Sequence, residues 1–302
     1  MSIFVVGATG IVGGAVARHL LSLNWAVHAT TRNPDSKASK ALQALGAKLF
    51  KGTWDDERAL LTALAGCSTL FLNPYTYPFD QGEEVHWSNL ILTTAKAAGV
   101  KQVVFTSIFG TQNPEKLKYQ HPLVTKVQES KGKVEQLVRA AGFDFWTILR
   151  PGYFMASFLL PKAVLFAGFL ETGRWTTALL PESPMPLIDE HDIAVFTAAA
   201  LADKVRFNRK EIELSGELRN PEEITKALSG ASGREIKAVY LTAEEVEAQE
   251  ADPLVGAYLA LRDMHLYVDI DQVKAWGLPI GTFEAYLARK NDVVQETYGL
   301  KA

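Results

Sequence analysis

The sequence predicts an α/β protein with a doubly wound parallel sheet and a smaller C-terminal α+β lobe. A glycine-rich loop separates the first apolar run from a helical stretch, and short runs of Val, Ile, Phe and Thr then alternate with longer helical stretches. This alternation breaks down after Pro151. Such a pattern is typical of parallel strands joined by crossover helices, followed by a lobe of different construction.

Six strands and five helices are expected in the first half of the chain. The strands are predicted at residues 3–6, 25–31, 47–50, 68–73, 101–107 and 143–149. The helices are predicted at about 11–23, 36–45, 56–65, 82–98 and 123–141, several of them closed by a glycine. Residues 1–150 should therefore form a Rossmann-type domain with strand order 3-2-1-4-5-6, which binds ligands where that order reverses.

The second half begins with proline and glycine residues that divide the chain into short pieces between 151 and 186. A helix near 190–202, a strand at 211–214 and helices near 221–229, 243–265 and 282–290 are predicted beyond them. We expect residues 151–302 to form a substrate-binding lobe, some segments of which return to the main sheet.

The first loop has the spacing of a dinucleotide-binding turn. Its glycines would permit a sharp turn, a close backbone approach to a pyrophosphate, and close packing of helix on strand. The phosphates would lie at the positive end of the first helix. The expected contacts are Gly7, Thr9, Gly10, Ile11, Val12 and Gly13.

The end of the second strand favours NADP(H) as the cofactor. An acidic residue that would bind the ribose 2′-hydroxyl of NAD is missing there, and Arg32 lies near its expected position. A guanidinium suits a 2′-phosphate. Lys37 could add a second positive charge and Thr31 a hydroxyl. The alternative is that Arg32 is a solvated loop residue.

The loops after the third and fourth strands are expected near the adenine and the nicotinamide. Asp55 and Asp56 follow the third strand, although carboxylates in the first turn of a helix are also favoured without any ligand. Asn73 and Pro74 follow the fourth strand and are expected beside the ribose and nicotinamide.

The composition disfavours several other classes of protein. The net charge is −3 and long Lys/Arg runs are absent, which argues against direct binding to nucleic acid or anionic lipid. Cys67 is the only cysteine, so an intrachain disulfide and a multi-thiolate zinc site are excluded, and a reducing compartment is expected, the cytoplasm or else the nucleus. No apolar run suggests a signal peptide or a membrane span, and no metal is expected.

The chain resembles the NmrA-like family, atypical members of the short-chain dehydrogenase/reductase superfamily. The resemblance covers nearly the whole chain. It rests on residues 7–13, Arg32-Asn33-Pro34, residues 46–64, residues 103–107, residues 148–152, Pro186-Leu187-Ile188-Asp189 with Asp192-Ile193, and Leu214-Ser215-Gly216. It implies a Rossmann domain whose small C-terminal lobe closes a cleft over NADP(H).

The usual proton donor of that superfamily is missing. The Tyr-x-x-x-Lys pattern has Val127 in place of the tyrosine, with Lys131 four residues later. Ser107 matches the serine position of the superfamily. Candidate proton sources near the nicotinamide are Lys131, Tyr119, His121 and Tyr153, although His121, next to Pro122, could simply begin a helix. Ser107, Lys131, Pro151 and Tyr153 are also expected to contact the cofactor.

An aromatic cleft is expected at the carboxyl ends of the strands and the start of the lobe. It suggests a small hydrophobic or aromatic substrate. The aromatic residues in these places are Tyr75, Tyr77, Phe109, Tyr119, Tyr153, Phe154 and Trp175, and His121 is a further candidate contact.

These features predict an NADPH-dependent oxidoreductase that reduces a quinone, an imine or an enone, because hydride transfer to an electron-poor carbon needs positioning more than a strong acid. One alternative is an NADP(H)-sensing regulator that binds a transcription factor or another protein, as the resemblance also implies. A second is a cofactor-bound enzyme with non-redox chemistry. A protein partner or a homodimer remains open.

Overall fold

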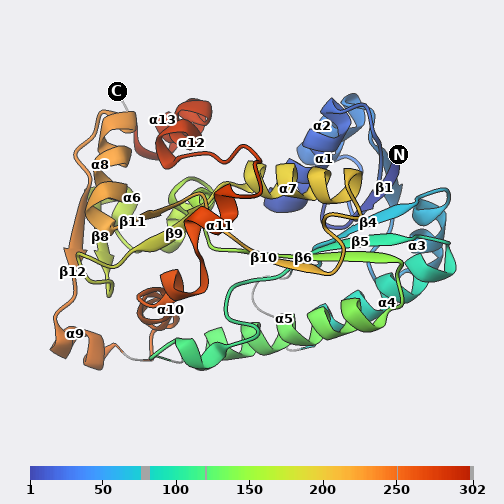
Figure 1. Cartoon of the computed structure of the whole chain (residues 1–302). Coiled ribbons are helices and arrows are strands. Elements are labelled where there is room, and N and C mark those ends of the chain that lie inside the picture. Colours follow the sequence, from blue (N-terminus) through green and yellow to red (C-terminus); the bar gives the residue numbers. More distant parts are fainter. Residues whose placement is uncertain (76–81, 120, 250, 300–302) are drawn as a thin grey trace. The chain divides into compact units, whose positions relative to one another are not determined.

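The computed structural model describes residues 1–75, 82–119, 121–249 and 251–299, and Figure 1 shows its helices and strands. The chain divides into two compact units. The first comprises Met1–Thr111, Lys126–Arg150 and Glu190–Ile212, and the second Gln112–Thr125, Pro151–Asp189 and Glu213–Ala302. One border falls at the expected residue 150, while residues 190–212 belong to the first unit and residues 112–125 to the second.

A seven-stranded sheet forms the centre of the first unit, in the order β10-β6-β5-β4-β1-β2-β3. The six strands from β3 to β6 run parallel to their neighbours, which confirms the predicted order. The predicted strand at 211–214 extends the sheet beside β6, as a returning segment. The bounds are β1 (Ser2–Val5), β2 (Ala26–Thr31), β3 (Lys48–Lys51), β4 (Thr69–Leu72), β5 (Gln102–Thr106), β6 (Phe145–Pro151) and β10 (Lys210–Leu214).

Helices cover both faces of this sheet (Figure 1). They are α1 (Ile11–Ser22), α2 (Lys37–Ala44), α3 (Glu57–Leu64), α4 (Glu83–Ala97), α5 (Pro122–Ala140) and α7 (Glu190–Ala202). Alternate strand residues such as Phe4, Leu70 and Phe105 pack against Leu60, Ile91 and Val134 of α3, α4 and α5. On the other side α1 packs against α7. Successive side chains point to opposite faces of the sheet, so the central strands are mainly apolar on both faces because helices cover both of them.

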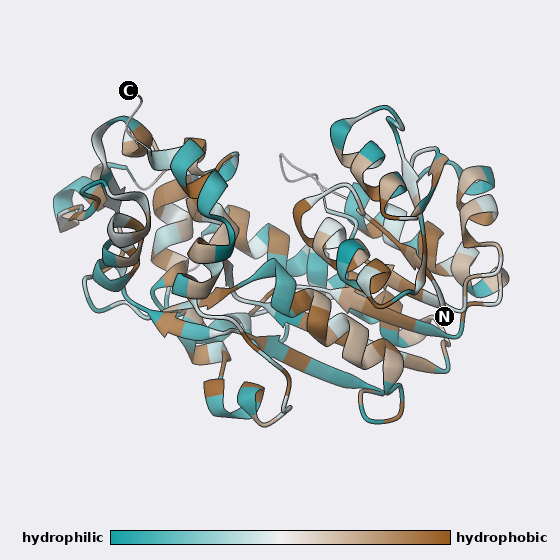
Figure 2. Cartoon of the chain, turned by 90° about the horizontal axis from the view of Figure 1, so that it is seen from above, coloured by the Kyte–Doolittle hydropathy of each residue, from teal (hydrophilic) through white to brown (hydrophobic). Residues whose placement is uncertain are grey.

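The second unit contains short strands and helices. Its strands are β7 (Tyr153–Phe154), β8 (Arg174–Thr177), β9 (Met185–Ile188), β11 (Glu217–Arg219) and β12 (Lys237–Tyr240). Its helices are α6 (Phe169–Thr172), α8 (Pro221–Ser232), α9 (Ala243–Ala248), α10 (Pro253–Leu261), α11 (Ile270–Lys274), α12 (Phe283–Arg289) and α13 (Asn291–Tyr298). Short 3₁₀ helices are η1 (Pro114–Lys116), η2 (Met155–Phe158), η3 (Lys162–Leu165) and η4 (Met264–Tyr267). Hydrophobic and hydrophilic stretches alternate along both units (Figure 2).

The sequence pattern was wrong about helix lengths in this unit. The long helix expected at 243–265 is two helices, because Pro253 lacks the N–H that a helix interior needs and instead begins α10, with Asp252 Oδ1 accepting from the Leu254 N–H at 2.8 Å. The terminal helix expected at 282–290 is followed by α13, and the short strands β7, β8, β9, β11 and β12 were not predicted.

Candidate functional site

The first loop turns sharply from β1 into α1. Gly7 has φ +73°, a conformation that favours glycine, and its carbonyl accepts a 2.9 Å hydrogen bond from the Gly10 N–H. Gly10 caps α1 without a side-chain hydrogen bond, and the first turn of the helix holds no acidic residue. Thr9, Gly10 and Ile11 are exposed. The first N–H groups of α1 are therefore open to an anion.

Two close approaches fix the position of this loop. A Cβ on Gly13 would lie 2.3 Å from the Gly7 carbonyl oxygen, so only glycine lets α1 pack this close to the strand. A Cβ on Gly7 would lie 3.0 Å from the Asn73 carbonyl oxygen. The end of β4 thus borders the loop, as the order of the strands requires.

Arg32 lies exposed at the end of β2. Within the parts of the chain that the structure describes, its guanidinium has no ion-pair partner. Asn33 turns the chain by accepting from the Asp35 N–H at 3.0 Å, and Ser36 caps α2, whose first residue is the exposed Lys37. Thr31 is buried, and its hydroxyl is 3.0 Å from that of Ser39, so this hydroxyl is already engaged.

The two aspartates after β3 have partners within the protein. Asp56 Oδ1 accepts from the Ala59 N–H at 2.9 Å and so caps α3. Asp55 accepts from the Trp87 indole N–H at 2.6 Å. The helix-start explanation, left open by the sequence, therefore accounts for Asp56, and Asp55 links this loop to α4.

The described part of the segment after β4 ends at an exposed aromatic residue, Tyr75. Tyr75 is 45% exposed, whereas Pro74 is buried and Asn73 is half-buried. The Tyr75 N–H donates to the Asn73 carbonyl at 3.1 Å. Tyr77 lies outside the described residues.

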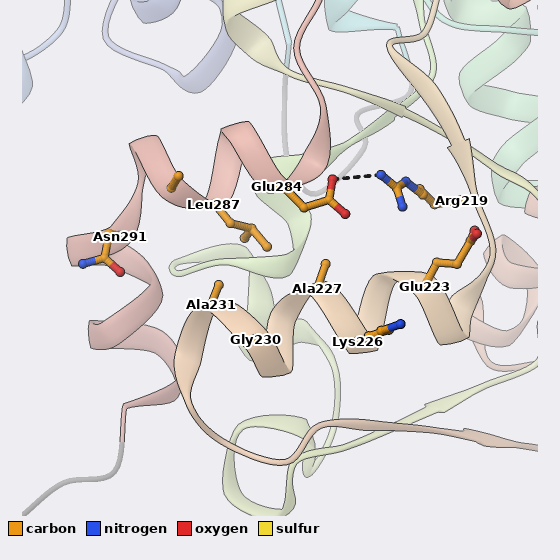
Figure 3. A pocket seen from close by; sticks show the side chains of 10 residues that line it. Arg219, Glu223, Lys226, Ala227, Gly230, Ala231, Glu284, Leu287 and Asn291 are labelled. Carbon is orange, nitrogen blue, oxygen red and sulfur yellow. Dashed lines mark hydrogen bonds and ion pairs between the residues drawn. The ribbon is translucent and has the colours of Figure 1, made fainter.

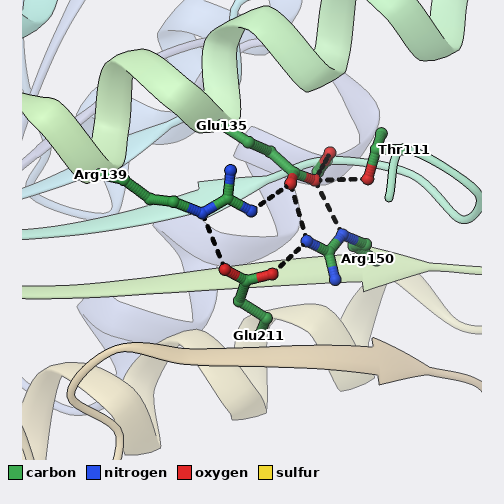
Figure 4. Close-up of polar contacts among 6 residues, drawn as sticks. Thr111, Glu135, Arg139, Arg150 and Glu211 are labelled. Atoms are coloured by element: carbon green, nitrogen blue, oxygen red, sulfur yellow. Dashed lines mark hydrogen bonds and ion pairs between the residues drawn. The ribbon is translucent and has the colours of Figure 1, made fainter. Parts of the chain in front are cut away.

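Ser107 belongs to a buried ion-pair network. Its hydroxyl donates to Glu135 at 2.6 Å. The Thr111 hydroxyl donates to the same oxygen at 2.7 Å (Figure 4). Arg150 on β6 donates to both oxygens of Glu135, at 2.8 and 2.7 Å. The structure thus gives the Ser107 O–H a carboxylate acceptor, which competes with the proton-transfer role that the resemblance implies.

Two further residues complete this network. Arg139 bridges Glu135 and Glu211 at 2.7 and 2.8 Å, and Arg150 also pairs with Glu211 at 2.5 Å. Burial alone would raise the pKa of Glu135, but hydrogen bonds and charge from Arg150, with help from Ser107 and Thr111, lower it overall. The pKa of Glu211 is lowered for the same reasons by Arg139 and Arg150. The network therefore holds two carboxylates ionised between α5, β6 and β10.

Lys131 belongs to α5, and its buried side chain lies near the carboxyl end of β5. Its Nζ lies 2.6 Å from Glu84 Oε1 on α4 and 3.5 Å from the Thr106 carbonyl oxygen. Sequence reasoning missed Glu84, because Glu83-Glu84 looks like an ordinary acidic helix start. The Thr106 hydroxyl is buried and has no hydrogen-bond partner among the described residues. Buried hydroxyls are usually hydrogen-bonded, so a polar group of a ligand could bind to it at this strand end.

The remaining candidates differ widely in exposure. Phe109 in the first unit is buried, and in the second unit Tyr119 and Phe154 are half-buried while Pro151 is buried at the end of β6. Burial raises the pKa of Tyr153 to about 12, partly offset by a hydrogen bond with Ser157, so its phenol stays protonated at neutral pH.

Two candidates have structural roles. His121 Nδ1 accepts from the Leu123 N–H at 3.2 Å, so His121 does begin α5. Trp175 has no exposed surface, and its indole N–H donates to the Tyr258 hydroxyl at 2.7 Å. The structure therefore corrects the placement of Trp175: it lies in the hydrophobic core of the second unit and not on an open pocket wall.

A cavity of about 570 Å³ lies in the second unit, between α8 and α12–α13 (Figure 3). Small side chains such as Ala227 and Ala231 line it, and the Arg219–Glu284 ion pair at 2.8 Å stands at one end. None of the residues predicted to bind substrate line it.

Two kinds of feature, a membrane-spanning helix and a cluster of metal-binding side chains, are absent from the described residues. No helix there combines the length and the apolar composition needed to cross a membrane. Over the same ranges, His, Cys, Asp and Glu side chains form no group of three or more that could hold a metal ion.

The fold and the first loop define a Rossmann-type protein, a class that binds its ligands at the carboxyl ends of parallel strands. The model of the NmrA-like family matches residues 1–278, so the chain belongs to the NmrA-like family. This confirms the resemblance seen in the sequence.

Three similar proteins represent the relatives. An NAD(P)H azoreductase of Xenophilus azovorans is 28% identical over 245 residues, covering 81% of this chain and 79% of the relative. The solved structure of NmrA, a negative transcriptional regulator in complex with NAD, has a TM-score of 0.76 at 20% identity and covers 99% of this chain and 98% of its own. An NADPH-dependent quinone oxidoreductase from Escherichia coli, complexed with NADPH, has a TM-score of 0.74 at 22% identity, with coverages of 96% and 99%. At these identities the two solved structures show a shared fold.

Proposed function

We propose that this protein is an NADPH-dependent reductase of a flat or conjugated organic compound, such as a quinone, an imine or an enone. The observation that carries the proposal is the uncapped start of α1, with an exposed arginine one strand away that has no ion-pair partner among the described residues. The similarity to an azoreductase and a quinone oxidoreductase supports the same reaction class.

The first unit would bind the cofactor by its phosphates. The N–H groups of the first turn of α1 would donate to the diphosphate, and the close packing of Gly13 on Gly7 keeps that turn near the strand. Arg32 would bind the 2′-phosphate, with Lys37 as a second positive charge. The hydroxyl of Thr31 would support this loop through Ser39 and need not contact the phosphate.

When bound, NADPH supplies a hydride. This chain's residues would position its nicotinamide beside the ends of β4 and β5, where Asn73 and Thr106 lie. Lys131 would donate a hydrogen bond to a ribose hydroxyl. Burial raises the pKa of Tyr153 to about 12, which makes its phenol a weak acid, so the proposal does not depend on proton transfer from it.

The absence of the superfamily tyrosine directs the proposal to electron-poor acceptors. Val127 cannot donate a proton, so a carbonyl that needs strong acid assistance is a poor substrate. Quinones, imines and enones accept hydride with less assistance. The exposed ring of Tyr75 could lie against a flat substrate of this kind.

Turnover with a panel of acceptors tests the reaction class. We expect the purified protein to oxidise NADPH, followed by the absorbance of the reduced nicotinamide, in the presence of at least one quinone, cyclic imine or enone. A simple ketone should react far more slowly. If NADPH binds and none of these acceptors is reduced above background, the reductase proposal is wrong.

Arg32→Ala should weaken NADPH binding by about 30-fold and leave NADH binding nearly unchanged, since a charge-assisted contact to phosphate contributes about 2 kcal/mol. Calorimetric titration of both nucleotides measures this. Lys40→Ala, which removes an exposed charge on the same helix as Lys37, is the control and should have little effect. Equal losses for NADPH and NADH would refute the 2′-phosphate role.

A regulatory role is the second candidate, favoured by the missing tyrosine and by the structural similarity to NmrA. In that case the protein would bind nicotinamide nucleotides without turning over any acceptor. It would also retain a protein partner differently with NADP⁺ and NADPH. Pull-downs with each nucleotide, followed by partner identification, distinguish this role from the reductase.

A further inference from the structure

The Lys131 ammonium lies in a buried polar cluster between α4 and α5. It is 4% exposed, 2.6 Å from Glu84 Oε1 and 3.5 Å from the Thr106 carbonyl oxygen, and it lies 5.4 Å from the centre of the Phe105 ring. An ammonium has three N–H donors. Among the described residues, two oxygens lie near these donors, Glu84 Oε1 as the ion-pair partner and the Thr106 carbonyl oxygen as a hydrogen-bond acceptor, so at least one N–H is left to bind another acceptor.

Glu84 is held from α5 as well as by its own helix. The Ser130 hydroxyl donates to Glu84 Oε2 at 3.1 Å, while Oε1 faces Lys131. The contact between Lys131 Nζ and Glu84 Oε1 is an ion pair whose angles fall outside those of a regular hydrogen bond. Glu84 is 7% exposed. Its charge is therefore directed mainly to Lys131.

We propose that Glu84 is a positioning residue for the cofactor site: its carboxylate holds the Lys131 ammonium at the end of β5, with one N–H free to bind a hydroxyl of NADPH. The inference rests on the proposed function, since it concerns how the cofactor is held. It adds a residue on α4 that no superfamily motif in this chain contains.

The physical reason is the cost of a buried charge. A buried ammonium without a counter-charge is strongly unfavourable and would turn away from the site or lose its proton. The Glu84 carboxylate compensates the charge of the ammonium, and the Phe105 ring adds a cation–π contact with the same ammonium. The buried hydroxyl of Thr106, which has no partner among the described residues, lies beside the carbonyl that Lys131 approaches, so this strand end retains polar groups for a ligand.

A double-mutant cycle on NADPH affinity tests the proposal. Glu84→Gln keeps the size of the side chain and removes its charge, and Lys131→Met removes the ammonium. Each single variant should bind NADPH about tenfold more weakly, the loss expected for one charge-assisted hydrogen bond. The double variant should bind about as weakly as Lys131→Met alone, because Glu84 acts through Lys131.

Calorimetric titration gives the affinities, and thermal unfolding shows that each variant is folded. Glu235→Gln, which removes the same charge from an exposed ion pair with Lys237 in the second unit, should leave the affinity unchanged. If Glu84→Gln does not fold, the double variant is compared with Lys131→Met instead, because it holds two uncharged side chains and leaves no buried charge without a partner.

The proposal is overturned if Glu84→Gln binds NADPH as the unchanged protein does. It is also overturned if the double variant binds about tenfold more weakly than Lys131→Met, since Glu84 would then act independently of Lys131. If the unchanged protein gives no heat with NADPH, the proposed function itself fails. Binding and turnover in the unchanged protein together with an unaffected Glu84→Gln would refute the positioning role alone.

Discussion

Glu135→Gln is expected to lower the free energy of unfolding by about 3 kcal/mol, because the network would then hold the two guanidinium groups of Arg139 and Arg150 against the single carboxylate of Glu211. Glu135 accepts hydrogen bonds from Ser107, Thr111, Arg139 and Arg150, and it is 1% exposed. The neutral amide cannot balance the Arg150 guanidinium, which is itself 1% exposed. Urea unfolding of the two proteins at pH 7 measures the difference.

The pH dependence of stability provides an internal check. The folded-state pKa of both Glu135 and Glu211 is lowered, so the stabilisation from the network is complete above their ordinary pKa of 4.5 and is lost as the pH falls through the lowered values. The difference between the unchanged protein and Glu135→Gln should therefore shrink below pH 4.5. An equally large difference at pH 3 and pH 7 would contradict the assigned role of this carboxylate.

Gly13→Ala is expected to abolish measurable NADPH binding, a loss of about 100-fold or more, and to lower stability by about 2 kcal/mol. The new Cβ would lie 2.3 Å from the Gly7 oxygen and 2.9 Å from the Val6 oxygen. Both are backbone atoms, so the loop must move away from the start of α1. Calorimetry with NADPH and thermal unfolding measure the two effects.

Gly230→Ala is the matched control for this substitution. Gly230 lies inside α8, and a Cβ there would meet nothing within 4 Å. Alanine is a better helix former than glycine, so this variant should gain up to about 1 kcal/mol and bind NADPH normally. Normal NADPH affinity in Gly13→Ala would show that the loop does not hold the diphosphate.

The first half of the fold was predictable because local signals agreed with the tertiary arrangement. Buried parallel strands are apolar throughout, and the helices between them end at glycines such as Gly46 and Gly99, both with positive φ. The strand order followed from the handedness of crossover connections. The second half was predicted less well, because prolines and glycines between residues 151 and 186 interrupt the alternation of strands and helices that located the strands of the first half.

The candidate site likewise contains features that the local sequence predicts and contacts that it does not. The turn at Gly7 and the cap at His121 depend on local backbone geometry. The turn was predicted from neighbouring residues, and the helix start at His121 was one of two interpretations that the sequence left open. The partners of Ser107 and Lys131 were not, because Glu135 and Glu84 lie on helices 28 and 47 residues away in sequence, and their spacing from the strand follows no local period.

The amino-acid sequence by itself determined the Rossmann-type sheet, the glycine turn at its centre and the family, since these depend on short-range patterns and on chain connectivity. The tertiary structure alone decided which charges are compensated. Ser107 donates to a buried carboxylate, Trp175 lies in a core and Lys131 pairs with Glu84 because folding brings together side chains from separate elements, and the low polarity of the interior requires each buried charge to find a partner there.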